Sequence, residues 1–403
     1  MLRRRGHRVV FVVEESFAGT LEARGFEERL MRLAPAPDVP EAPGQFWKDF
    51  IRETAPAFRG TTTEQLTSFI APTWQALTDG ARYVDARLSE IFAELEPDAI
   101  VEDNVCSFPA ILAGGRPWVR IVSCNPLELS DPQLPPTFSG LPLDDRSGWE
   151  PFRAEYARQV GDLQASFSEF CRERGAPPLP PPAMIHESPW LNLYLFPREL
   201  DYPRSAPLGP TWRRVEACVR TTDAPWEPPA DDGRRLVYLS LGSLGSADVA
   251  LMRRLVELLA DTPHRYIVSR GPRHDEYELA DNMSGAEFLP QPSLLPHVDA
   301  VITHGGNNTV TESMWFGQPM LVLPIFWDQH DNAQRVAEAG YGIRLPTYAL
   351  DGGELAAAVD RLLTDADLRQ RAAAAGERLR RHPGTVAAAD LIERVAVTGQ
   401  PVG

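Results

Sequence analysis

Short apolar runs alternate with amphipathic segments throughout the second half of this 403-residue chain. Residues 236–241 form a run of the buried-strand type, a glycine-rich turn follows at 242–246, and residues 250–259 have the spacing of an amphipathic helix. Further elements follow, namely strands at 266–268, 300–303, 321–323 and near Ile343, and a helix at 334–339 that Gly340 ends. This alternation predicts a parallel sheet with helices on both faces and ligands at the carboxyl ends of its strands.

The first half of the chain alternates in the same way, although less regularly. Strands are expected at 9–13, 99–101 and 119–122, and a long helical pattern covers 63–95. We therefore predict an α/β protein of two domains. The boundaries are a first domain at 1–210, an irregular linker rich in proline and tryptophan at 211–232, and a second domain at 233–384. A helical tail at 385–403 could pack back on the first domain.

The chain begins in an unusual way for such a domain. Residues 2–6 resemble the last turn of a helix, with three arginines followed by a C′ glycine, and no strand precedes them. The pattern therefore opens inside the first βαβ unit, and the first domain is expected to lack its first strand. Two explanations compete. We favour a start misassigned to an internal codon of a longer natural protein; the alternative is that the chain truly lacks this strand.

Charge and composition narrow the possible partners. The formal net charge is −16, which argues against nucleic acid or an anionic membrane as the main partner. No apolar run approaches the ~20 residues of a membrane-spanning helix. The four cysteines are scattered and form no Cys-x-x-Cys pair, which fits structural roles in a reducing, cytoplasmic compartment. They are Cys106, Cys124, Cys171 and Cys218.

The most informative segment is 288–332. Its centre is a strand at 300–303, then His304-Gly305-Gly306-Asn307, then the start of a helix at Asn308. The first N–H groups of a helix have no partner within the helix and carry positive partial charge. A glycine turn before them lets an anion approach the backbone closely. The pattern therefore predicts a phosphate site at this strand end.

The string from 288 to 329 resembles the donor-binding signature of the UDP-glycosyltransferase type, glycosyltransferase family 1. It begins with aromatic-x-Pro-Gln, continues with His-x-Gly-x-Asn-Ser/Thr-x-x-Glu and ends with Asp/Glu-Gln. The resemblance covers nearly the whole chain and is greatest to bacterial members that glycosylate macrolides and other small natural products. It implies the GT-B fold, in which two Rossmann-like, doubly wound domains face each other across a cleft.

The resemblance also implies a role for each matching residue. Phe288 would stack on the nucleotide base, and Gln291 would contact the base edge. Glu312 would bind the ribose hydroxyls, and Asp328 with Gln329 would bind the transferred sugar. The diphosphate would be held by Gly242, Ser243, His304, Gly306, Asn308 and Thr309.

Several of these residues also have a simpler interpretation. The spacing of Thr309 and Glu312 fits a capping box, so Glu312 could cap a helix. Asp328 could cap a helix beginning near Asp331, and Phe288 taken alone would be a core residue. Fixed N–H donors and an imidazole can stabilise a leaving diphosphate without a metal. We therefore expect no obligatory metal and no cofactor beyond the nucleotide sugar as co-substrate.

The expected chemistry needs a general base for the acceptor hydroxyl. In the family that the chain resembles, the base is a histidine on the loop after the first strand, and a later aspartate orients it. Asp103 matches that aspartate, although it could also be an ordinary loop residue. The histidine is absent from this sequence. His7 lies at the wrong end of its unit, and nothing connects His186 with the cleft.

We therefore expect inverting transfer of a hexose or deoxyhexose from a UDP- or dTDP-sugar to a hydroxyl of a hydrophobic small molecule, by a cytoplasmic monomer or homodimer. Aromatic residues of the first domain could line the acceptor pocket, although most could equally be core residues: Phe46, Trp47, Phe69, Trp74, Phe108 and Trp149. Two other functions stay open. One is a non-catalytic auxiliary homologue, and the other is a GT-B sugar-nucleotide epimerase.

Overall fold

Six parallel strands form the sheet of the second half in the computed structural model, which describes residues 1–36, 49, 52–221 and 223–403. Their order across the sheet is β12-β11-β10-β7-β8-β9. Every residue of β7, β10 and β11 is buried, as expected for central strands with helices on both faces. The strands are β7 (Leu236–Ser240), β8 (Arg265–Ser269), β9 (Met283–Ala286), β10 (Ala300–Thr303), β11 (Met320–Val322) and β12 (Gly342–Arg344).

The helices of this half alternate with its strands, as the sequence predicts. They are α6 (Gly242–Gly245), α7 (Val249–Leu259), α8 (Gln291–Leu294), α9 (Asn307–Phe316), α10 (Gln329–Glu338), α11 (Gly352–Thr364) and α12 (Ala366–Arg381). The expected turn at 242–246 is a short helix instead. Ser240 of β7 pairs with Thr303 of β10, so the loops that follow these two strands are neighbours.

The strands of the first half form two sheets instead of one. A four-stranded parallel sheet contains β3 (Ile100–Asp103), β4 (Trp118–Val122), β5 (Leu191–Tyr194) and β6 (Trp212–Arg214), in that order. A separate parallel pair contains β1 (Val10–Glu14) and β2 (Glu27–Met31). The strands expected near 9–13 and 99–101 are thus both present, but they lie in different sheets.

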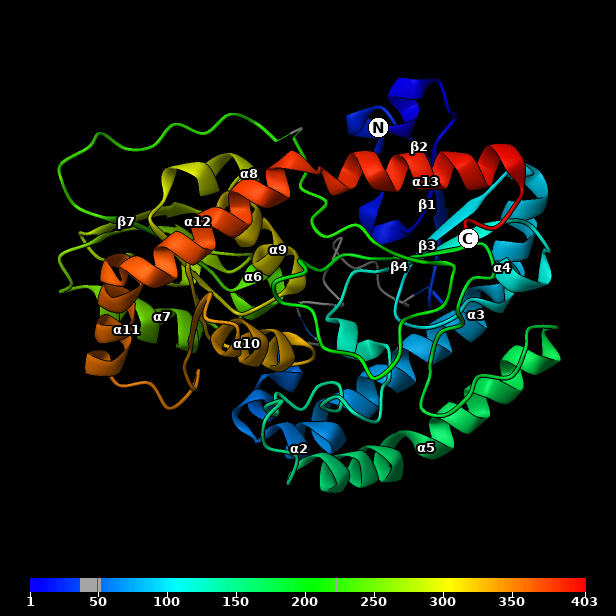
Figure 1. Cartoon of the computed structure of the whole chain (residues 1–403), viewed down its shortest axis with the longest axis horizontal. Coiled ribbons are helices and arrows are strands. Elements are labelled where there is room, and N and C mark those ends of the chain that lie inside the picture. Colours follow the sequence, from blue (N-terminus) through cyan, green and yellow to red (C-terminus); the bar gives the residue numbers. More distant parts are fainter. Residues whose placement is uncertain (37–48, 50–51, 222) are drawn as a thin grey trace.

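Long helices cover the first half. The helical pattern at 63–95 corresponds to α2 (Thr62–Gln65), the π-helical turn η5 (Leu66–Ile70) and α3 (Ala71–Leu95), which follow one another without a break. A second long helix, α5 (Trp149–Glu173), packs against α3. Between them in sequence lies the short α4 (Pro109–Ala113). Figure 1 shows α3 and α5 together on the side of this half that faces away from α13 (Gly384–Thr398).

The ends of the chain meet on the first half. The first residues form the single 3-10 turn η1 (Leu2–Arg5), which ends at Gly6 with a φ of 92°. Helix α13 runs from the second half across to β5, where Val395 and Val402 are buried. His7 bonds Glu393 of α13 at 2.7 Å. The segment proposed as a linker, 211–232, contains β6, so strand pairing with the first sheet continues into it.

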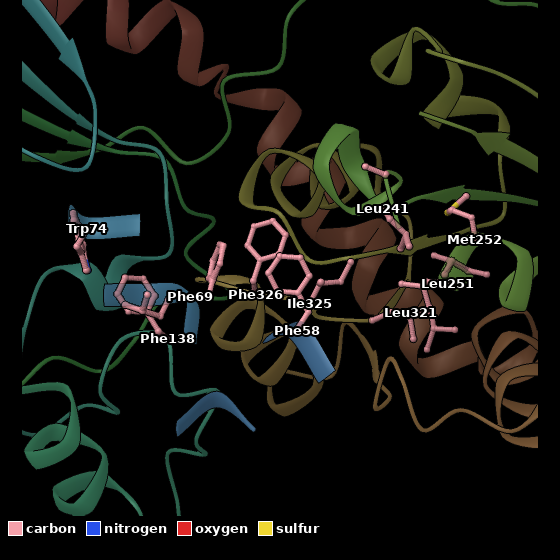
Figure 2. Packing of buried hydrophobic residues seen from close by; sticks show 14 of the residues in the cluster. Phe58, Phe69, Trp74, Phe138, Leu241, Leu251, Met252, Leu321, Ile325 and Phe326 are labelled. Carbon is pink, nitrogen blue, oxygen red and sulfur yellow. The ribbon is translucent and has the colours of Figure 1, made fainter. Parts of the chain in front are cut away.

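The two halves share one apolar core where they meet. Phe58 of the 3-10 turn η4 (Ala55–Arg59) packs on Phe326, with ring centroids 4.8 Å apart. Phe69 of η5 lies 5.1 Å from the same ring. Figure 2 shows these rings between Trp74 and Phe138 on one side and Ile325 and Leu251 on the other. The core therefore places the loop before α10 directly against the first half.

Candidate functional site

The amino end of α9 is built to receive an anion. Gly306 is its N-cap residue, no side chain caps it, and the N–H groups of the first turn therefore have no partner within the helix. Asn308 is exposed there, as is Ser243 after the neighbouring strand β7. The predicted diphosphate residues are thus brought together at adjacent strand ends. Thr309 differs from them, because it is buried and accepts a hydrogen bond from Gln291.

His304 lies between two glycines. A Cβ atom at Gly242 would lie 2.8 Å from the imidazole Cε1, and one at Gly306 would lie 2.5 Å from Nε2. Real Cβ atoms do not approach other heavy atoms so closely, so no larger residue fits at either position without moving the ring. Gly242 also has a φ of +69°, which L side chains rarely adopt. These glycines are therefore required by the position of the histidine.

The imidazole of His304 is uncharged at neutral pH. Burial lowers its pKa to about 4, although a hydrogen bond with the Ser240 backbone opposes the shift. A neutral imidazole still donates one N–H group and carries no charge that a bound anion would have to neutralise. Any positive potential at this site then comes mainly from the helix end.

The residues predicted for the nucleoside lie together beside the loop before α8. The Phe288 ring is 60% exposed, so the alternative of a core residue is wrong and one face is free to stack on a base. Gln291 donates to Glu312 Oε2 at 2.6 Å, and Arg220 lies 3.6 Å from Oε1. Desolvation raises the pKa of Glu312. The capping-box alternative for Glu312 is also wrong, because α9 begins at Asn307 and no side chain caps it.

A cavity of about 740 Å³ opens beside these residues. The second half contributes Leu289 and Pro290 to its wall, and the segment before that half contributes Arg220. The first half contributes Arg4 and Arg24. Its volume falls within the range of ~300–1,000 Å³ that is usual for small-molecule sites. The cavity has room for a nucleoside, and its lining residues Leu289 and Pro290 directly follow Phe288 in the chain.

The two residues predicted to bind the sugar are buried and already bonded to protein. The Asp328 carboxylate accepts the Asn125 N–H of the first half at 2.8 Å, and burial raises its pKa to about 6. Asp328 is the N-cap residue of α10, but its side chain makes no cap bond, so that alternative is not realised. Gln329 Oε1 accepts the N–H groups of Ile325 and Phe326. In this conformation the Asp328 side chain joins the two halves, whereas the Gln329 side chain holds the loop before α10 within the second half.

Asp103 ends the edge strand β3 and is exposed. Its carboxylate accepts a 2.7 Å hydrogen bond from Ser123, and the Ser123 carbonyl in turn accepts from Asn307 of α9. Desolvation raises the Asp103 pKa, and the Ser123 bond opposes the shift. Neither first-half histidine pairs with it, because His7 bonds Glu393 and His186 bonds Ser107. Asp103 is thus connected to the donor side of the cleft by one short chain of bonds.

The aromatic residues proposed for an acceptor pocket separate into different environments. Phe69 and Trp74 contact Trp327 of the second half, with centroids 6.5 and 5.1 Å away. Phe108 and Trp149 are buried within the first half. Phe46 and Trp47 lie outside the described residues.

Sequence reasoning missed the residues that join the halves. Asn307 donates to the Ser123 and Leu195 carbonyls. Asp331 accepts the N–H groups of Phe138 and Gly140 at 2.6 and 2.8 Å. Trp327 packs on Phe138 with tilted rings whose centroids lie 4.4 Å apart, and its φ is +56°. A bulky residue at positive φ is a marked outlier, which the sequence does not reveal.

Comparisons with known proteins agree with this geometry. Residues 253–393 match the family model of the erythromycin biosynthesis protein CIII-like C-terminal domain. The chain is 27% identical over 319 residues to a demethyllactenocin mycarosyltransferase of Streptomyces fradiae. That alignment covers 76% of this chain and 65% of the relative, so the chain spans just under two thirds of that protein's length.

Two solved structures resemble the chain over almost its full length. The glycotransferase of kitacinnamycin has a TM-score of 0.71 at 23% identity, covering 98% of this chain and 92% of that one. A Streptomyces sp. SF2575 glycosyltransferase complexed with thymidine diphosphate has a TM-score of 0.62 at 16% identity, covering 98% and 93%. These likenesses establish the fold.

The fold and the comparisons give the chain the GT-B architecture of two Rossmann-like domains, and the proteins that it is similar to are glycosyltransferases. Its second domain is similar to the erythromycin biosynthesis protein CIII-like C-terminal domain, and the similar proteins include bacterial natural-product glycosyltransferases. None of the described helices is both long enough and apolar enough to cross a bilayer.

Proposed function

We propose that the chain moves a hexose or deoxyhexose from a UDP- or dTDP-sugar to a hydroxyl of a hydrophobic small molecule, with inversion at the anomeric carbon and without a metal. The observation that carries this proposal is the uncapped amino end of α9 beside the His304 ring, which lies between two glycines. The solved relative with thymidine diphosphate supports a nucleoside diphosphate as the ligand class. The four free cysteines are consistent with a cytoplasmic place of action.

Charge development at the leaving diphosphate explains the arrangement. As the glycosidic bond breaks, the β-phosphate gains negative charge, and donors already in position stabilise it without reorganisation. The α9 N–H groups are such donors, and His304 joins them when its single N–H group turns from the Ser240 backbone to the phosphate. Glu312 and its partner Gln291 supply carboxylate and amide groups for adjacent ribose hydroxyls.

The transferred sugar is proposed to meet Asp328 and Gln329. Because Asp328 is bonded to Asn125 of the first half, sugar binding would exchange that interdomain bond for bonds to sugar hydroxyls. Donor binding should then loosen the contact between the domains. Asp103, linked through Ser123 to Asn307, is proposed as the carboxylate of the proton-transfer machinery for the acceptor hydroxyl.

Calorimetric titration with UDP and dTDP, with and without EDTA, tests the donor part of this proposal. One of the two nucleotides should bind, and EDTA should not change the affinity. Glu312→Gln should weaken binding, whereas Glu354→Gln, a matched charge change at an exposed helix position, should not. Absence of binding by both nucleotides would refute the donor site.

Incubation with donor sugar and a set of hydrophobic alcohols and phenols tests the transfer. The product should carry the anomeric configuration opposite to that of the donor, as seen in the NMR coupling constant. A protein that binds nucleotide but forms no glycoside with any acceptor would be an auxiliary homologue. Conversion of the donor sugar without acceptor would instead indicate an epimerase.

A further inference from the structure

A second, larger cavity lies between the domains, and the segment 344–350 forms much of its wall. Its volume is about 970 Å³. Phe58, Arg59 and Thr62 line it from the first domain, and Arg254, Arg344 and Tyr348 are among the residues that line it from the second. None of the residues predicted to bind the donor contributes to it. It is therefore distinct from the nucleotide site, and its ligand is not explained by the proposed donor.

The charge of this cavity is opposite to that of the protein. The chain has a net charge of −16, but among the described residues that line the cavity three are arginines and none is acidic. A pocket of one sign with low-dielectric walls concentrates ions of the other sign. The cavity should therefore attract anions although the protein as a whole repels them.

The positive charge of Arg344 is poorly compensated. This half-buried side chain donates to two neutral acceptors, the Gly140 carbonyl at 2.8 Å and Gln334 Oε1 at 2.6 Å, both through Nη1. No described carboxylate lies within ion-pair distance of it, and Nε and Nη2 have no acceptor among the described residues. The two acidic groups nearby are Asp331, whose pKa burial raises to about 8, and Glu338, and neither is within ion-pair distance of Arg344. A partly buried cation without an anion favours an anionic ligand.

The other two arginines leave donors available as well. Arg254 is exposed on α7 and has no ion pair among the described residues. Arg59 donates to the Ala55 carbonyl at 3.1 Å, lies over the Tyr348 ring and has its one described ion pair with Asp248, at 3.5 Å. Arginine binds carboxylate and phosphate groups through paired N–H donors, so these side chains suit both kinds of anion.

The hydroxyl groups of the wall are arranged as acceptors. Thr62 donates to the Ser139 carbonyl, Thr347 to the Pro324 carbonyl and Tyr348 to Asp248. Since their protons are committed to protein, their lone pairs remain for donors of a ligand. His330 is another lining residue, and its Nδ1 has no partner among the described residues while Nε2 bonds the Ile325 carbonyl. The wall thus offers arginine donors for an anion and oxygen acceptors for hydroxyl groups.

We infer that this interdomain cavity binds a small molecule that carries both an anionic group and several hydroxyls. The anion is held by Arg344 and Arg254, and the hydroxyls donate to the threonine and tyrosine oxygens. This inference does not depend on the donor assignment. A carboxylate-bearing acceptor and a separate hydroxylated acid share this chemistry, and the test below distinguishes them.

The test uses glucuronate as the probe, glucose as its neutral counterpart, and saturating UDP to fill the donor site. Binding to the full chain is measured by ligand-observed NMR at constant ionic strength. Glucuronate should bind, and glucose should bind roughly tenfold more weakly or not at all. Equal affinity for the two sugars, or displacement of glucuronate by UDP, would overturn the inference.

Three variants locate the site. Arg254→Gln and Arg344→Gln should each weaken glucuronate binding roughly tenfold, because each removes a charge-assisted contact. Arg253→Gln is the matched control, since it lies on the same helix outside the cavity, and it should leave binding unchanged. Arg254 is exposed and has no described partner, so its replacement should not affect folding. Equal losses in all three variants would show only general attraction and refute the site.

A last arm separates the two sources of the ligand. A nucleotide-sugar donor is added to the glucuronate complex, and products are followed by mass spectrometry. Glycosylated glucuronate would show that the anionic group belongs to the acceptor. Bound but unmodified glucuronate would show a ligand site separate from transfer. Both results support the cavity as an anion site, provided that the arginine variants weaken binding.

Discussion

Replacing Gly242 with alanine should damage the diphosphate site while leaving the fold intact. The new Cβ would lie 2.8 Å from His304 Cε1 and 2.9 Å from Nε2, closer than real Cβ contacts. The imidazole must therefore leave its present position between Gly242 and the amino end of α9. The backbone at position 242 has a φ of +69°, and an alanine there costs about 1–2 kcal/mol. The variant should thus lose both some stability and much of its nucleotide affinity.

The chain supplies a control that separates these two effects. Gly399 has a φ of +62°, and no heavy atom lies within 4 Å of the place that a Cβ would take there, so Gly399→Ala carries a similar backbone strain without a clash. Gly399→Ala should lose about 1–2 kcal/mol in urea unfolding, and Gly242→Ala at least as much, because both place alanine at positive φ and only Gly242→Ala adds a clash. Only Gly242→Ala should weaken UDP or dTDP binding, by at least about tenfold, or ~1.4 kcal/mol. Unchanged nucleotide affinity in Gly242→Ala would refute the role given to His304.

Four further changes probe other parts of the account. Glu312→Gln keeps the shape of the side chain but removes its charge, and should weaken nucleotide binding severalfold in calorimetry. Asp103→Asn should lower the transfer rate at least about hundredfold, with nucleotide affinity unchanged, if the carboxylate serves proton transfer. Asp331→Ala leaves two buried N–H groups of the first domain without an acceptor, and should cost roughly 2–6 kcal/mol in urea unfolding. Burial lowers the His330 pKa from 6.5 to about 4, so between these pH values the unfolded chain binds a proton at this residue that the folded chain does not. Stability should therefore be highest above pH 6.5 and fall as the pH decreases toward 4, and His330→Gln should remove this part of the pH dependence.

The strands and turns of the second domain could be predicted closely because the sequence patterns that indicate them are local. The strand at Ala300–Thr303 and the glycine at Gly340, with a φ of 75°, are where the pattern of 300–343 places them. These features depend on neighbouring residues and on short-range periodicity. The position of the predicted donor residues at the ends of β7 and β10 could also be predicted, because neighbouring parallel strands bring their carboxyl ends together.

The interface between the domains could not be predicted in this way. Asp328 contacts Asn125, and Asp331 contacts Phe138, across about two hundred residues of sequence. No periodicity connects such distant positions, and the motif alone suggested only a sugar contact for Asp328. The positive φ of Trp327 is likewise a consequence of packing between domains, because nothing in the local sequence requires it.

The first domain was less predictable for a related reason. The pattern indicated its strands, but the separation of β1 and β2 from the sheet of β3 to β6 depends on pairing partners. Strand pairing is a tertiary property, and a run of apolar residues does not specify its neighbour. The aromatic residues proposed for the acceptor pocket are on this domain, and the sequence could not predict their positions for the same reason. Trp74 is at the interface, whereas Trp149 is buried elsewhere.

A crystal structure with UDP or dTDP bound would show whether the amino end of α9 is the diphosphate site. We expect the β-phosphate within hydrogen-bond distance of the N–H groups at the start of α9 and of His304, with the base on Phe288 and the ribose at Glu312. It also predicts that the nucleotide leaves the arginine-lined interdomain cavity empty. A nucleotide bound away from the amino end of α9 would contradict the assignment of the donor site.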